Sequence, residues 1–176
     1  LILLPDETMN SLLEKYIPPT FSYGSASRTL SSRYPVEGLR EIVVNAIVHK
    51  DYRIEEPVTV SVHPNRIDVF CYGGLPEGWT TETLVGDHQS LRRNITLATL
   101  YHDAGFVENW AQGIRKVFRE CERNGNPKPE FFLESGGLRA TIISNVIDVD
   151  ERISIPVVST KTKSPTDRQK NIVRMM

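Results

Sequence analysis

The sequence lacks several features that would point to a particular class of protein. The 176-residue chain has no apolar run near the roughly 20 residues that a membrane-spanning helix needs. Its start does not have the charged and then apolar pattern of a signal segment. Its two cysteines, Cys71 and Cys121, cannot form a disulfide framework and do not have metal-binding spacing. We therefore expect a cytoplasmic protein without a membrane partner or a structural zinc site.

An excess of charge of one sign is also missing. The chain has 21 Lys and Arg residues against 22 Asp and Glu residues, which gives a net charge of -1. This balance excludes a basic sheath for nucleic acid as a property of the whole chain, although it leaves a local patch open. The phosphate loop Gly-x-x-x-x-Gly-Lys-Ser/Thr is absent as well, which excludes a Walker-type helicase motor.

What is present is enough apolar material for one domain, with 39% hydrophobic residues. We expect an N-terminal helix and lead-in segment over residues 1–33 and the main domain over residues 34–147. A linker over residues 148–165 and the start of a truncated helix over residues 166–176 would follow. The first residue is not Met, and the last helical pattern is cut short. Both features predict a piece of a longer protein.

Hydrophobic periodicity and turn residues predict the local structure. Helices are expected over residues 7–16, 35–50, 94–103 and 108–124, with a helical turn at 80–85. Short strands are expected near 21–23 and 29–31. Two hairpins are expected, one from strands 57–62 and 66–71 and one from strands 131–134 and 138–144.

The helix over residues 35–50 has an unusual pattern. Glu41, Asn45 and His49 fall within roughly 80° of one another on a helix that is otherwise almost entirely apolar. One interpretation is that this stripe is the solvent-facing side of a half-buried helix. The other is a site in which Glu41 orients an attacking water and Asn45 gives an oxygen ligand to Mg²⁺. The residues alone leave both open.

The helix also resembles a known family. Residues Tyr34–Tyr52 look like the N-box helix of the GHKL (Bergerat) ATPases. They are more closely similar to the divergent, Schlafen/AlbA-associated branch in transcriptional regulators that is known as the RecG-like ATP-dependent DNA helicase C-terminal domain. Five further elements match in order: Arg66–Val69, Gly73–Gly78, Ser90 with Arg93 and Asn94, Gly105–Glu108, and Trp110 with Gly113 and Ile114.

This resemblance implies an α+β fold, a two-layer α/β sandwich with a mixed, mostly antiparallel sheet and a nucleotide between the sheet and the helices. It implies ATP and Mg²⁺ as cofactors and a homodimer. DNA contacts would come from flanking domains outside this chain, including a winged helix that residues 166–176 would begin. Glu41 would be the catalytic residue and Asn45 the metal ligand, and the cofactor-binding residues would be Gly73, Gly74, Gly78, Arg93, Asn94 and Gly113.

The chain departs from the family at both glycine boxes. Cys71 stands where the family has an acid or amide that reads the base, and Ala111 replaces the first glycine of the second box. Asp68 is the nearest acid, but strand alternation would have to bring it to the site.

Three interpretations of the function follow. The first is a nucleotide-binding, ligand-gated switch in a DNA-associated regulator with at most weak Mg²⁺-dependent ATPase activity, and the Glu41–Asn45 pair favours it. The alternative is a nucleotide-free scaffold for dimerisation or domain coupling, which the two departures favour. Direct DNA binding by this chain is a third reading. The target DNA, the sensed signal and the role of His49 stay open.

Overall fold

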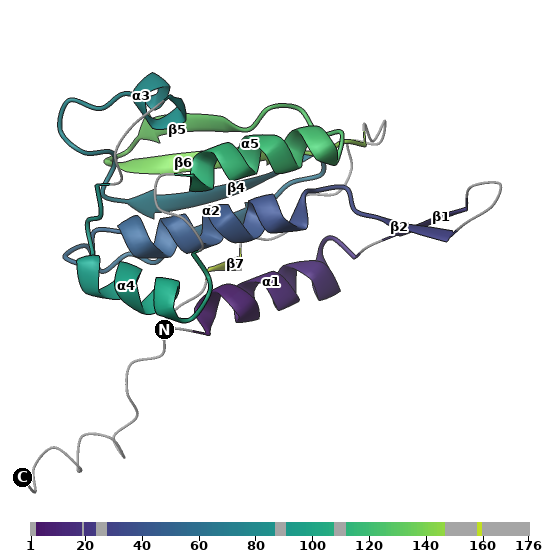
Figure 1. Cartoon of the computed structure of the whole chain (residues 1–176), viewed down its shortest axis with the longest axis horizontal. Coiled ribbons are helices and arrows are strands. Elements are labelled where there is room, and N and C mark those ends of the chain that lie inside the picture. Colours follow the sequence, from purple (N-terminus) through teal and green to yellow (C-terminus); the bar gives the residue numbers. More distant parts are fainter. Residues whose placement is uncertain are drawn as a thin grey trace, which may run out of the picture.

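The computed structural model describes residues 3–18, 20–23, 28–86, 91–107, 112–146 and 158–159, and these form an α+β fold, as expected (Figure 1). Its elements are α1 (Leu4–Lys15), β1 (Thr20–Tyr23), β2 (Arg28–Ser31), α2 (Val36–His49), β3 (Thr59–Val62), β4 (Arg66–Tyr72), α3 (Thr81–Val85), α4 (Ile95–Asp103), α5 (Gly113–Arg123), β5 (Glu130–Glu134), β6 (Gly137–Ile143) and β7 (Val158–Ser159).

The main sheet has five strands in the order β5-β6-β4-β3-β7. Every pairing between described strands is antiparallel, including the short pairing of β7 with β3. β3–β4 and β5–β6 are the two expected hairpins. β7 lies within residues that we expected to be linker. Along β4, Ile67, Val69 and Cys71 point to the buried side of the sheet, as the period of two requires.

The helices form the second layer. Figure 1 shows α2 and α5 side by side across one face of the sheet, and α2 also contacts β4 and α1. Because α2 is covered on several sides, its apolar residues Leu39, Val43 and Ile47 are all at most 2% exposed. This explains why the sequence of α2 is apolar in nearly every direction.

Asparagine side chains fix the segment that leads into α2. Asn126 donates from Nδ2 to the carbonyls of Arg33 and Ile143, each over 2.8 Å. Asn124 donates to the Ser32 carbonyl over 2.9 Å. The start of α2 is therefore tied to the end of α5 and to β6, which holds the two site-bearing helices in one position.

The ribbon of β1 and β2 stands apart from this body (Figure 1). Among the described strands, β1 and β2 pair only with each other.

Most element boundaries agree closely with the expected ones, but the helix expected over 108–124 begins at Gly113, and residues 108–111 lie outside the described residues. α1 begins earlier than predicted, because Pro5 is accommodated in its first turn. Pro35 is the residue that precedes α2, and Thr80 caps α3 in a box with Thr83. The expected roles of Ser90, Trp110 and Ala111, and the helix over 166–176, lie outside the described residues. Within the part of the chain that is described, no helix has the length and apolarity to cross a bilayer.

Candidate functional site

The polar stripe of α2 faces a cavity between the helices, the sheet and the loop after β4. The cavity volume is about 130 Å³. Its lining residues are Glu41, Ile42, Asn45, Ala46, Val48, His49, Val69, Cys71, Gly74, Leu75, Pro76, Trp79, Leu84, Leu91, Val107, Gly113, Ile114, Phe131, Leu138 and Ala140. The stripe therefore lines a pocket and is not simply the solvent-facing side of the helix. Most of the lining is apolar, and none of the lining residues within the described ranges is Lys or Arg.

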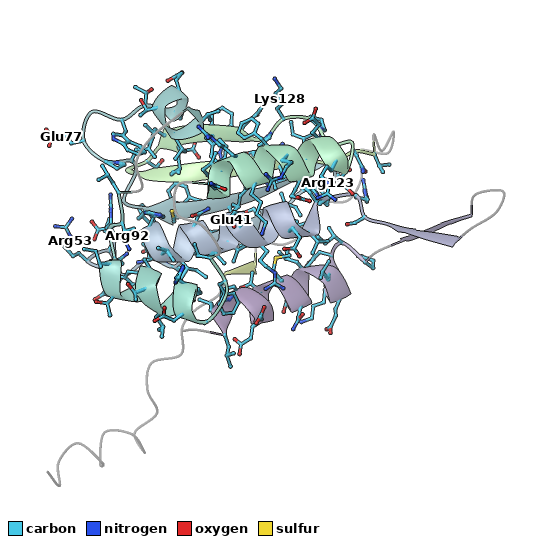
Figure 2. All side chains as sticks on the ribbon, in the orientation of Figure 1. Glu41, Arg53, Glu77, Arg92, Arg123 and Lys128 are labelled. Carbon is cyan, nitrogen blue, oxygen red and sulfur yellow. The ribbon has the colours of Figure 1, made fainter. Side chains whose placement is uncertain are left out.

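Glu41 and Asn45 are hydrogen-bonded to each other within this wall. Asn45 Nδ2 donates to Glu41 Oε1 over 3.1 Å, as residues four apart on a helix can. Glu41 is only 7% exposed, and Figure 2 labels it on the central part of α2, next to α5. Among the described residues, Asn45 Oδ1 accepts no hydrogen bond. The Asn45 amide oxygen, next to the buried Glu41 carboxylate, is therefore available as a ligand atom.

Gly113, the first residue of α5, packs against the side chains of Glu41 and Asn45. A Cβ at Gly113 would overlap Glu41 Oε1 and stand 3.0 Å from Glu41 Cδ and 3.2 Å from Asn45 Nδ2. Only glycine lets α5 begin so close to α2. The N-terminus of a helix carries partial positive charge, which helps to stabilise the buried Glu41 carboxylate.

The other end of the stripe has a different character. His49 lies two turns beyond Glu41, in the same cavity as Cys71. Burial lowers the pKa of His49, and the nearby positive charge of Arg93 lowers it further. Burial raises the pKa of the Cys71 thiol to about 11. Both groups are therefore uncharged at neutral pH. No hydrogen bond to the His49 ring is made by any residue in the described ranges.

Arg93 closes the loop beside this end instead of lining the cavity. Its guanidinium donates to the carbonyl of Gly73 and, over 3.4 Å, to that of Gly74. It also lies 3.7 Å from Asp51 Oδ2. Gly73 has a φ of 123°, and a Cβ there would overlap Arg93 Nη1 and stand 2.9 Å from the Asp51 amide nitrogen. The structure thus brings Gly73, Gly74 and Arg93 together through contacts that shape the loop, and their predicted role in binding a cofactor stays a prediction.

Asn94 and Gly78 lie outside the cavity lining. Asn94 precedes α4 as expected, but its side chain makes no capping bond to that helix. Its Nδ2 instead donates to the carbonyls of Val48 and Lys50, over 2.7 and 2.8 Å, at the C-terminal end of α2. Gly78 is an exposed turn residue with a φ of 77°. The sequence pattern could not have identified the contact between Asn94 and α2, because it joins residues more than 40 positions apart.

Asp68 does not reach the site. It is buried on the opposite side of the sheet from Cys71, where Thr141 Oγ1 donates to Oδ1 over 2.7 Å. His63 Nε2 and Arg66 Nε lie 3.0 and 3.1 Å from its other oxygen. The strand residue that faces the cavity at the end of β4 is Cys71. The base-reading acid of the GHKL enzymes therefore has no counterpart from β4.

The donor set at Glu41 and Asn45 fits Mg²⁺ only as part of a larger coordination shell. Carboxylate and amide oxygens suit this hard cation, which is usually held by one or two protein ligands together with waters and substrate phosphates. Within the described ranges, no group of three His, Cys, Asp or Glu side chains could hold a metal alone. Because residue 113 is a glycine, only backbone atoms of α5 lie beside the Glu41 and Asn45 side chains at this point. The residues present therefore fit a metal that arrives with a phosphate ligand.

Comparisons with known proteins agree with this architecture. The DIP2311 protein from Corynebacterium diphtheriae has a similar fold, with a TM-score of 0.70 and 19% sequence identity over 81% of this chain and 28% of that chain. The present chain thus spans less than a third of that protein. No curated protein matches the sequence.

A family match carries the assignment. Residues 55–142, half of the chain, match the family described as "Putative ATP-dependent DNA helicase recG C-terminal". The match covers β3 to β6 and the loop after β4, whereas α2 precedes it. The chain belongs to this family, an ATPase-like domain related to the C-terminal region of RecG helicases.

Proposed function

We propose that the cavity binds a nucleotide together with Mg²⁺, and that the domain acts as a ligand-gated switch in a DNA-associated regulator. The observation that carries this proposal is the Glu41–Asn45 pair, enclosed by Gly113 in the wall of an apolar cavity. Among the described residues Asn45 Oδ1 accepts no hydrogen bond, and an amide oxygen beside a buried carboxylate is a suitable ligand for a hard cation. Family membership supports the same conclusion.

In this proposal each group has a defined task. Asn45 Oδ1 would hold the cation, which would supply positive charge for the phosphates, since no described lining residue is Lys or Arg. Glu41 Oε1 accepts a hydrogen bond from a water beside it and thus orients that water. Gly74 and Gly113 let the backbone approach the ligand closely. Gly73, Arg93 and Asn94 keep the surrounding loop and the end of α2 in place.

The gating element in this proposal is the loop after β4. Leu75 and Trp79 line both the cavity and a shallow hollow on the other side of the loop. Because the cavity of about 130 Å³ is smaller than the roughly 300 Å³ of typical ligand pockets, a whole nucleotide requires this loop to move. A full-length protein with DNA-binding domains, in a homodimer in the cytoplasm, would use that movement as its signal.

Thermal unfolding with Mg²⁺ and millimolar ATP, ADP or GTP tests the proposal. A nucleotide at 100 times its Kd stabilises the folded state by about 2.7 kcal/mol, which raises Tm by several degrees. We expect a Mg²⁺-dependent rise that is lost in Asn45→Ala. Asn10→Ala, the same change at an exposed position of α1, is the matched control and should keep the rise. The absence of any rise in the unchanged chain would contradict nucleotide binding.

One observation favours the scaffold function as a second candidate. β5 is an edge strand, and its residues Phe132 and Leu133 are 40% and 49% exposed. An edge with unpaired backbone groups and exposed apolar residues can pair with another chain. If the unchanged chain binds no nucleotide and Leu133→Lys converts a dimer into a monomer in light scattering, association through this edge is the better description.

A further inference from the structure

The proposed function gives no role to His49. This residue lines the cavity, and its ring forms no hydrogen bond with any described residue. It is the one polar side chain of the α2 stripe that lies away from the Gly113 contact. Glu41 and His49 are eight residues apart, which puts them roughly 12 Å apart along the helix axis. The cavity therefore has two polar ends with different chemistry.

The Glu41 end is suited to a cation and its anionic ligand, because it offers oxygen donors and the start of α5. The His49 end offers an uncharged ring nitrogen and the thiol of Cys71, in a cavity whose other lining residues are mostly apolar. Charge alone does not assign the phosphates to one end of the cavity, since the positive charge of Arg93 acts on His49. Arg93 is, however, already engaged by Asp51 and two carbonyls, and it does not line the cavity.

Resting on the proposed function, we infer that His49 is the specificity-determining residue that reads the nucleobase. A neutral imidazole offers one donor and one acceptor nitrogen, so it can pair with the polar edge of a neutral heterocycle. The cavity volume of about 130 Å³ includes both polar ends, so size does not assign the base to one of them. The chemistry does, because an uncharged and largely apolar end suits the neutral ring system of a base better than the charged phosphates.

Two fragments of a nucleotide separate the two ends experimentally. The chain has four histidines, so the His49 ring signals in a ¹H–¹⁵N spectrum can be assigned by their loss in His49→Gln. We expect adenosine or guanosine to shift the His49 ring signals without Mg²⁺. Inorganic tripolyphosphate with Mg²⁺ should shift the Asn45 side-chain amide signals and leave the His49 ring unchanged. A His49 shift with tripolyphosphate and none with any nucleoside would overturn the inference.

Affinities for the four nucleoside triphosphates give the second readout. Loss of a hydrogen bond to the base should weaken binding about 5- to 150-fold. We expect His49→Phe to show this loss for the preferred base and to make the four affinities nearly equal. His49→Gln keeps a donor and an acceptor and should restore part of the preference. His102→Gln, a change at an exposed position of α4, is the control and should leave the affinities unchanged.

The outcomes distinguish the two proposals. If the unchanged chain binds nucleotides and His49→Phe keeps the same base preference, the role of His49 is wrong while nucleotide binding stands. If the unchanged chain binds no nucleoside and no nucleotide, the proposed function fails and the inference fails with it.

Discussion

Gly113 of α5 touches the carboxylate of Glu41 so closely that a Cβ at this position would overlap Glu41 Oε1. This contact joins the first residue of α5 to the polar stripe of α2. It explains physically why the second glycine of the glycine box is present here. The contact also makes the roles of the two residues separable by mutation.

Gly113→Ala should destabilise the fold by about 1–3 kcal/mol, because the added methyl group must displace the Glu41 side chain. In the Glu41→Ala background the overlapping oxygen is gone, so the same change should cost clearly less. Urea unfolding of the four proteins of this double-mutant cycle measures the difference. Equal costs in both backgrounds would show that the overlap does not determine the requirement for glycine.

Gly73→Ala should behave differently, although its Cβ would also overlap a charged side chain. Its φ of 123° is unfavourable for any residue with a Cβ, and the Asp51 amide nitrogen would stand 2.9 Å away. Removal of the side chain in Arg93→Ala relieves neither of these problems. We therefore expect Gly73→Ala to cost a similar amount, about 1–3 kcal/mol, with and without Arg93. Rescue by Arg93→Ala in the same urea experiments would contradict this.

These two glycines show how far the sequence predicts the site. The alternation of apolar residues and the turn residues predicted both hairpins and α2, because these are local patterns. The stripe of Glu41, Asn45 and His49 was visible for the same reason, but the residues alone left open whether it faced solvent or lined a site. The partner of that wall could not be predicted from local patterns, since Gly113 is more than 60 residues away from Glu41. Only the family resemblance brought the two together.

Arg93 and Asn94 were predicted from the family resemblance to bind the cofactor. In the described structure their donors contact backbone carbonyls of the loop after β4 and of α2. The pairing of β7 with β3 was missed, because β7 has only two residues, and a run of this length carries no periodic signal. Tertiary contacts of this kind have no signature in a single sequence.

Substitutions at Asn94 test whether its side chain stabilises the C-terminal end of α2 or the N-terminal end of α4. Asn94→Ala removes two hydrogen bonds to the last carbonyls of α2, and we expect a loss of about 1–3 kcal/mol. Asn94→Asp keeps a good residue for the start of α4 but places a negative charge at the negative end of α2. Aspartate should therefore be at least as destabilising as alanine, which thermal unfolding can measure. A nearly neutral Asn94→Asp would mean that Asn94 acts through α4.

The lowered pKa of His49 predicts a specific dependence of stability on pH. The folded state favours the neutral ring, because burial and then Arg93 lower the pKa below its ordinary value of 6.5. As the pH falls below 6.5, the unfolded chain takes up a proton at this position before the folded chain does. The free energy of unfolding should therefore decrease as the pH is lowered from 7.5 toward 5, by up to about 1.4 kcal/mol per pH unit from this residue.

His49→Gln removes this contribution and should flatten the decrease, whereas the exposed His102→Gln should leave it unchanged. The measurement is the urea unfolding free energy of the three proteins at a series of pH values. The unchanged chain and His49→Gln share every other titrating group, so the difference between these two curves isolates the ring at position 49. Parallel curves for His49→Gln and the unchanged chain would mean that the ring is protonated equally in both states. The imidazole would then titrate in the folded chain as it does in the unfolded chain, which would contradict a lowered pKa of His49.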